Sequence, residues 1–170
     1  KAKELITKIS EFLRYSLIEN SANEVPLLKE LEIARNYLEI EKIRFGKDLN
    51  YTIQADARSL EYPVPSFILQ PLLDNAIKYG TVEEQNGLQI KIDADVKNDN
   101  ELEIRVTNSG TLEKKGDNGD NSTNTGLANV ISRLDFLYPA NNSFSLYEMN
   151  KNVCARINIK REIIWVQNQF

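Results

Sequence analysis

The sequence predicts an α+β domain in which a mixed, mostly antiparallel β-sheet carries helices on one face. Apolar residues recur at helical spacing in four segments and alternate with polar residues in five others. Most of the strand-like segments follow one another through short polar turns, which favours antiparallel pairing. The helices are too few to cover both faces of such a sheet, so one covered face is the economical arrangement.

The first two helices are expected over residues 3–19 and from near Pro26 to Arg44. The second has glutamates in its early turns, basic residues in its last turn and a glycine just beyond, which agrees with the helix dipole and a glycine C-cap. In the first helix, residues 5–17 carry an apolar stripe. Such a stripe is normally buried against another element, which predicts a helix–helix contact in a dimer.

A third helix is expected over residues 69–80, "LQPLLDNAIKYG", and it has two different faces. One face is apolar, whereas Asn75, Lys78 and Tyr79 share the other at spacings of three and four residues. An amide oxygen can bind Mg²⁺ and a lysine can meet a phosphate, although a solvated helix face is the plain alternative. Gly80 is expected to stop the helix in a left-handed conformation.

The remaining helix and strands are predicted from the same two patterns, which are helical spacing of apolar residues and alternation of apolar with polar residues. Alternation predicts a strand over residues 49–56 and a hairpin over 88–108. A polar segment with several glycines, residues 109–124, is expected to form a mobile loop. Helical spacing returns over 125–138, and a second hairpin is expected over 142–160. A chain of 170 residues arranged in this way predicts one domain with one core.

Composition narrows the classes of function. Hydrophobic residues make up 41% and charged residues 27%, as in soluble globular proteins. The net charge of −4 and the pI of about 5.1 argue against a nucleic-acid binder. No apolar run approaches the roughly 20 residues of a membrane-spanning helix. The single cysteine, Cys154, lies in a strand-like run and is expected to be a small buried residue, and the chain has no histidine.

Three further features are typical of a binding site, and each has a structural alternative. "TNSG" (107–110) places a polar side chain and a glycine where a heterocycle could be bound, or it is an ordinary turn. Residues 125–127 open a helix whose free N–H groups could bind a phosphate, or the helix is simply capped. Arg133 could contact a phosphate or form a structural ion pair.

The motifs "VPSFILQPLLDNAIKYG", "IRVTNSG" and "TGLANVISRLDFLYP" resemble, in order and spacing, the N, G1 and G2 boxes of the GHKL superfamily. The match looks closest to the LytS-like sensor histidine kinases. "ISEFLRYSL" and "VPLLKELEIARNYLEIEKIRFG" resemble the end of the dimerisation helix and the segment that follows it in that group. The resemblance covers roughly residues 5–160. It implies a two-layer α/β sandwich, with a dimerisation helix ending in residues 1–22, an ATP-binding catalytic domain over 23–170 and a lid near 109–124.

By position, the resemblance assigns Asn75 to Mg²⁺, and Lys78 and Tyr79 to the phosphates and nucleotide. Asn108 takes the place of the aspartate that accepts a hydrogen bond from the adenine amino group. The expected ATP-binding set is completed by Gly110, Thr125, Gly126, Leu127 and Arg133.

Some positions depart from the family pattern. Asn108 replaces the aspartate, Leu112 stands at the second G1 glycine, and Asn124 stands where the G2 box often has glycine. In GHKL ATPases such as gyrase and MutL, a glutamate activates water at the position that Pro71 occupies here. Proline cannot act as a base, so hydrolysis of ATP is less favoured than transfer of its phosphoryl group. Because the chain has no histidine, the phosphoacceptor is expected upstream of it, and no catalytic residue is expected within it.

The resemblance therefore implies the catalytic domain of a two-component sensor histidine kinase. The parent protein is expected to be a homodimer in the bacterial inner membrane, with this domain in the cytoplasm. The expected partners are its own dimerisation and phosphoacceptor domain and a response regulator. Two alternatives stay open. The first is a degenerate, non-catalytic interaction module, which is favoured by the departures at Asn108, Leu112 and Asn124. The second is a serine kinase of the anti-sigma-factor type, which would need no histidine of its own.

Overall fold

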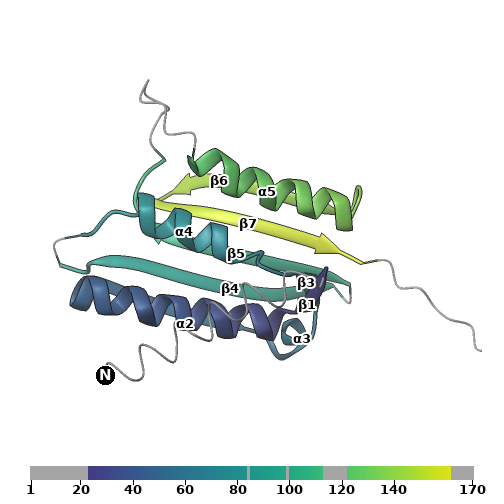
Figure 1. The fold of residues 1–170 in the computed structure, drawn as a ribbon, viewed down its shortest axis with the longest axis horizontal. Coiled ribbons are helices and arrows are strands. Elements are labelled where there is room, and N and C mark those ends of the chain that lie inside the picture. Colours follow the sequence, from purple (N-terminus) through teal and green to yellow (C-terminus); the bar gives the residue numbers. More distant parts are fainter. Residues whose placement is uncertain (1–22, 84, 99, 113–121, 162–170) are drawn as a thin grey trace, which may run out of the picture.

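A computed structural model describes residues 23–161 apart from residues 84, 99 and 113–121, and omits the side chains of residues 98 and 122–124 (Figure 1). The helix expected over residues 3–19 and most of the expected lid lie outside the described residues. The elements are, in order, β1 (Glu24–Pro26), α2 (Leu27–Phe45), a 3-10 helix (Gly46–Asp48), β2 (Leu49–Ala55), α3 (Ala57–Leu60), β3 (Pro63–Pro65), α4 (Gln70–Tyr79), β4 (Leu88–Asn98), β5 (Glu101–Ser109), α5 (Ser122–Leu137), β6 (Asn142–Met149) and β7 (Asn152–Lys160).

Five of the strands form one mixed sheet in the order β2-β4-β5-β7-β6. β2 and β4 pair in parallel, and the other three pairs are antiparallel. The β4–β5 and β6–β7 hairpins are both as predicted. β1 and β3 form a separate antiparallel pair, which the sequence did not predict because each strand is only three residues long and contains proline.

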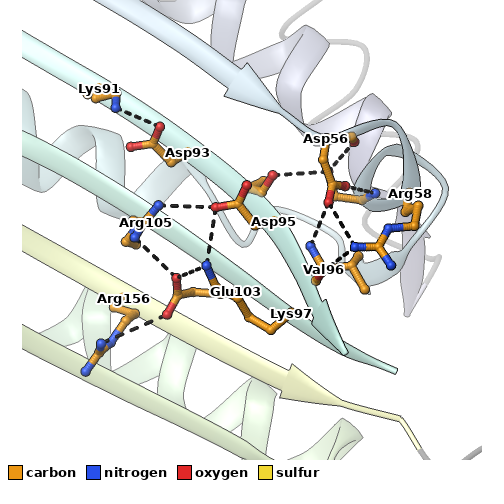
Figure 2. A network of polar contacts seen from close by, with 12 residues as sticks. Asp56, Arg58, Lys91, Asp93, Asp95, Val96, Lys97, Glu103, Arg105 and Arg156 are labelled. Atoms are coloured by element: carbon orange, nitrogen blue, oxygen red, sulfur yellow. Dashed lines mark hydrogen bonds and ion pairs between the residues drawn. The ribbon is translucent and has the colours of Figure 1, made fainter. Parts of the chain in front are cut away.

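The sheet has two different faces because its strands alternate. In β5, Leu102, Ile104 and Val106 are buried on the helix-covered side. The neighbouring Glu103 and Arg105 lie on the other side, where charged side chains form a network across the strands (Figure 2). One face of the sheet therefore belongs to the core, and the other carries paired charges.

Three helices cover the apolar face of the sheet. α2 contacts β2, α4 packs on β5 and contacts α5, and α5 contacts β6. Figure 1 shows α4 between α2 and α5. The buried leucines of these helices include Leu38 of α2, Leu72 and Leu73 of α4 and Leu134 of α5. This arrangement confirms the predicted two-layer sandwich with helices on one face.

Two smaller features bear on the sequence analysis. Cys154 is buried, as predicted. The short helix α3 was not predicted, and it is capped by Asp56, whose side chain accepts a hydrogen bond from the Ser59 N–H. Within the described part of the chain, no helix combines the length and apolar character needed to cross a membrane.

Two substitutions on β5 test the assignment of the faces. Ile104 is fully buried, so Ile104→Ala is expected to lower the free energy of unfolding by about 2–5 kcal/mol. Arg105→Ala removes only partly exposed ion pairs and is expected to cost about 1 kcal/mol or less. Urea unfolding of both variants measures the difference. Equal losses would contradict the assignment.

Candidate functional site

The polar face predicted for the third helix is present on α4. Asn75 is half-buried, whereas Lys78 and Tyr79 are exposed, and the Lys78 Nζ lies 5.1 Å from the centre of the Tyr79 ring. On the opposite side of the helix, Leu73 and Ala76 are buried in the core. α4 therefore holds an amide and an ammonium group at the surface on a helix that is fixed from beneath.

The carboxyl end of α4 is tied to the end of β5 by Ser109. The Thr81 N–H donates to the Ser109 carbonyl at 2.8 Å, and the Ser109 hydroxyl donates to the Thr81 carbonyl at 2.8 Å. Ser109 is buried, and its hydroxyl oxygen also accepts from the Gln89 N–H. No role was predicted for this serine, although it joins the end of β5 to the carboxyl end of α4.

Gly80 ends α4, but not in the left-handed conformation that was predicted. Its φ is −67°, which any residue adopts. A Cβ at this position would instead lie 2.3 Å from the Leu88 Cδ1 and 2.4 Å from the Ala76 carbonyl oxygen. The glycine is required because a side chain here would collide with the backbone of the last turn of α4 and with Leu88 at the start of β4.

Asn108 and Gly110 lie beside this end of α4. Asn108 is 4% exposed, and its Nδ2 donates to the Ser109 carbonyl at 3.0 Å. That bond uses the amide nitrogen and not Oδ1, the atom that would accept from an adenine amino group. Gly110 has φ +139°, and a Cβ there would lie 3.4 Å from the Tyr79 carbonyl oxygen. The structure thus places Asn108 and Gly110 beside the carboxyl end of the helix that carries Asn75, Lys78 and Tyr79.

The beginning of α5 faces the beginning of α4. A Cβ on Gly126 would lie 3.6 Å from the Cβ of Pro71, which is ordinary contact. Leu127 is half-buried in the same helix, and Thr125 is exposed. Residues 125–127 therefore lie near the amino end of α4, at the opposite end of the helix from Asn108.

Arg133 of α5 holds the turn that precedes α4. Its guanidinium donates to the Ser66 carbonyl at 2.8 Å and contacts the Ser66 Oγ at 3.0 Å. Ser66 is fully buried. The structure thus gives Arg133 a structural role through hydrogen bonds to a serine, and its contact with a phosphate stays a prediction.

Glu30 of α2 reaches the same turn and was missed as a functional candidate. It is 2% exposed, and its carboxylate accepts from the Phe67 N–H at 2.7 Å and from the Leu69 N–H at 3.2 Å. The sequence contained a signal for it, because an acid three residues after Leu27 and four before Ala34 lies on the apolar stripe of its helix.

A second contact joins α2 to α4. The Tyr37 side chain is hydrogen-bonded to Asp74, the residue before Asn75. Burial raises the pKa of the Tyr37 hydroxyl, and the hydrogen bond and negative charge of Asp74 raise it further. α4 is therefore linked to α2 both before its first turn and in its middle.

A depression of about 310 Å³ lies on the other face of the sheet, and its charges are already matched. It is lined by residues that include Lys91, Asp93, Arg105 and Tyr147. The Lys91 Nζ lies 2.9 Å from the Asp93 Oδ1, and Arg105 is paired with Asp95 at 3.2 Å (Figure 2). The basic side chains that line this depression are therefore engaged in ion pairs across the strands.

The residues around α4 fit a magnesium–nucleotide complex by their chemistry. The Asn75 amide oxygen is a hard neutral ligand of the kind that Mg²⁺ accepts beside phosphates and water. Lys78, one turn later, supplies positive charge for a phosphate. Asn108 supplies an amide acceptor next to a glycine where the backbone can approach a planar ring.

Two glycines test the packing around α4. Gly80→Ala is expected to lower the free energy of unfolding by roughly 1–3 kcal/mol, because the added methyl meets Leu88 and the Ala76 carbonyl. Gly126→Ala has room for its methyl in a helix and is expected to stabilise the fold by about 0.5–1 kcal/mol. Thermal unfolding measures both, and effects of the same sign would contradict this description.

Tyr37→Phe tests the link between α2 and α4. At neutral pH it is expected to cost about 0.5–1.5 kcal/mol through the lost hydrogen bond. The pKa of Tyr37 is raised in the folded state, so the unfolded chain loses this proton first, from about pH 10 upward. The advantage of the wild type should therefore shrink as the pH rises from 10 to 11. A difference that stays constant over this range would contradict the hydrogen bond.

Known proteins with similar sequences and structures agree with this fold. A family model described as histidine kinase matches residues 1–49. YwpD of Bacillus subtilis is 32% identical over 140 residues, which are 79% of this chain and 50% of YwpD. The sensor protein LytS of Oceanobacillus iheyensis is 36% identical over 112 residues, which are 65% of this chain and 19% of LytS.

Among solved structures, the catalytic domain of the histidine kinase ThkA superimposes with a TM-score of 0.59 at 18% identity, over 81% of this chain and 93% of that domain. The chain spans half or less of the length of the two relatives named above. It is homologous to LytS-like sensor histidine kinases, and its fold is that of a histidine kinase catalytic domain.

Proposed function

We propose that residues 23–170 bind ATP with Mg²⁺ and transfer the γ-phosphate to a histidine that lies outside this chain. The observation that carries this proposal is the polar face of α4. It places Asn75 and Lys78 on a helix whose carboxyl end is hydrogen-bonded to the strand end that bears Asn108 and Gly110. The homology to sensor histidine kinases supports the same reaction class.

Each residue of this set has a distinct task in the proposal. Asn75 would hold Mg²⁺, and the ion would neutralise part of the phosphate charge when bound. Lys78 would orient a phosphate as a point charge. Asn108 would accept a hydrogen bond from the adenine amino group, at a cost of about 1 kcal/mol relative to a charged aspartate. Gly110 would let the backbone approach the base.

Pro71, near the start of α4, favours transfer of the phosphoryl group over hydrolysis of ATP. Pro71 has no group that could take a proton from water, and it is the second residue of the helix. Phosphoryl transfer depends mainly on positioning and charge, which the residues of α4 and β5 can provide without a base. The chain contains no histidine, so the acceptor must come from another segment or chain.

The homology to sensor histidine kinases supports a wider proposal. We propose that residues 1–22 form the end of a dimerisation helix and that the acceptor histidine lies upstream in the parent protein. The proposed lid is shorter than the predicted 109–124, because Ser109 belongs to β5 and residues 122–124 belong to α5. The parent protein is proposed to be a homodimeric, membrane-anchored sensor that phosphorylates a response regulator. Neither the degenerate interaction module nor the serine kinase gains support from the relatives, which include sensor histidine kinases by name.

Binding of Mg-ATP is expected to stabilise the chain. At one hundred times Kd the ligand should add ~2.7 kcal/mol, which corresponds to roughly 5–11 °C for a domain of this size. Asn75→Ala should lose the part of this shift that depends on Mg²⁺. Thermal unfolding with ATP, with and without Mg²⁺, measures it.

The matched control is Asn158→Ala, on the helix-free face of the sheet, where the amide contacts Ser143. It should keep the full shift. A wild-type protein whose midpoint does not move at millimolar Mg-ATP would overturn the proposal. An equal loss in both asparagine variants would show that Asn75 is not the metal ligand.

A further inference from the structure

The turn that precedes α4 is held from two sides. Glu30 of α2 accepts hydrogen bonds from the N–H groups of Phe67 and Leu69, and Arg133 of α5 donates to Ser66. We infer that Glu30 is a positioning residue for the metal-binding face of α4. This inference rests on the proposed function and assigns to α2 a part in nucleotide binding.

The contact is a capping interaction supplied by another helix. Leu69 is the N-cap of α4, and its own side chain makes no capping hydrogen bond. The carboxylate that binds the backbone at this point comes from Glu30, 39 residues earlier in the chain. A negative charge at the amino end of a helix is favoured by the helix dipole. The start of α4 therefore depends on α2 for an interaction that most helices make locally.

The backbone of the turn needs this support. Phe67 has φ +59°, a conformation that bulky residues rarely adopt. The flanking Ser66 and Ile68 are both fully buried. A strained conformation persists only where its surroundings over-determine it, and the Glu30–Phe67 hydrogen bond is one of the interactions that do so here.

The turn controls where Asn75 stands. Asn75 follows Leu69 by six residues, about 9 Å along a rigid helix. The other end of α4 is tied to Ser109 through Thr81. Because the helix is fixed at both ends, release of its amino end should rotate or shift the polar face relative to Asn108. A metal ligand on α4 is more sensitive to such a shift than the proposed contacts of the base with Asn108 and Gly110, which lie on β5 and just after it.

Glu30→Gln is the sharpest change, because it keeps the size of the side chain. Its amide nitrogen would face a backbone N–H, so at most one of the two hydrogen bonds survives. The affinity for ATP is measured calorimetrically with and without Mg²⁺, at a temperature where circular dichroism shows each variant folded. We expect affinity for Mg-ATP to fall about tenfold, and affinity for metal-free ATP to fall less than about twofold.

Asp56→Asn and Glu32→Gln are the matched controls. Asp56 caps α3 through the Ser59 N–H and also accepts from the Val96 N–H of β4, so its hydrogen bonds go to α3 and β4 rather than to α4, and its loss should lower the unfolding temperature without changing the Mg²⁺ dependence. Glu32 is exposed on α2 and paired with Lys29. Glu30→Asp keeps the charge on a shorter side chain and replaces Glu30→Gln if the latter does not fold; its affinity for Mg-ATP should then fall by more than its affinity for metal-free ATP.

The outcomes distinguish a failure of the positioning role of Glu30 from a failure of the proposed ATP-binding function. A wild-type protein that does not bind Mg-ATP overturns both. If the wild type binds and Glu30→Gln, or Glu30→Asp in its place, keeps the wild-type ratio of the two affinities, the positioning role is wrong and the proposed function stands. If Asp56→Asn changes the ratio of the two affinities as much as the Glu30 variant does, the positioning role is also wrong, because the effect would then reflect a general loss of stability.

Discussion

The strict alternation of β5 is the constraint on which the rest of the structure depends. This strand pairs with β4 on one side and β7 on the other, and every second residue from Leu102 to Asn108 is buried. A slip of one residue would turn Ile104 out and bring Arg105 into the core. Because only one face can be apolar, the helices must all lie on it. The opposite face can then carry its paired charges in contact with solvent.

Crowding the helices onto one face creates the candidate site. α4 is the shortest of the three covering helices and lies on the central strand, in contact with α5 (Figure 1). It is joined to α2 through Glu30 and Tyr37 and to β5 through Ser109. Its polar side chains therefore stand on a helix fixed at both ends, which is the preorganisation that a metal and phosphate site requires.

The sequence predicted most of the fold because periodicity is a local signal. The helices α2, α4 and α5 and both hairpins lie where apolar spacing placed them. The misses depend on contacts distant in sequence. The parallel pairing of β2 with β4 leaves no local mark. The requirement for Gly80 comes from the close approach of the Ala76 carbonyl and of Leu88 and not from its own φ, and the strands β1 and β3 are too short for any period.

In the candidate site, too, the residues with a local sequence motif could be predicted, and those that act through distant contacts could not. Asn75, Lys78, Asn108 and Gly110 could be chosen from their motifs, and the structure brings them to one helix and the adjoining strand end. The supporting residues could not be chosen in this way. An acid early in a helix usually serves the helix dipole, so the buried position of Glu30 becomes evident only when the turn at Phe67 is placed against it.

The most direct test of a nucleotide site on α4 is to replace Mg²⁺ with paramagnetic Mn²⁺ in the ATP complex and measure the broadening of NMR signals. The strongest broadening should fall on the side-chain amide of Asn75 and the backbone of its neighbours in α4. The charged network around Arg105 and Glu103, on the opposite face of the sheet, should be unaffected (Figure 2). Broadening centred on that network, with sharp signals from α4, would contradict the proposed site.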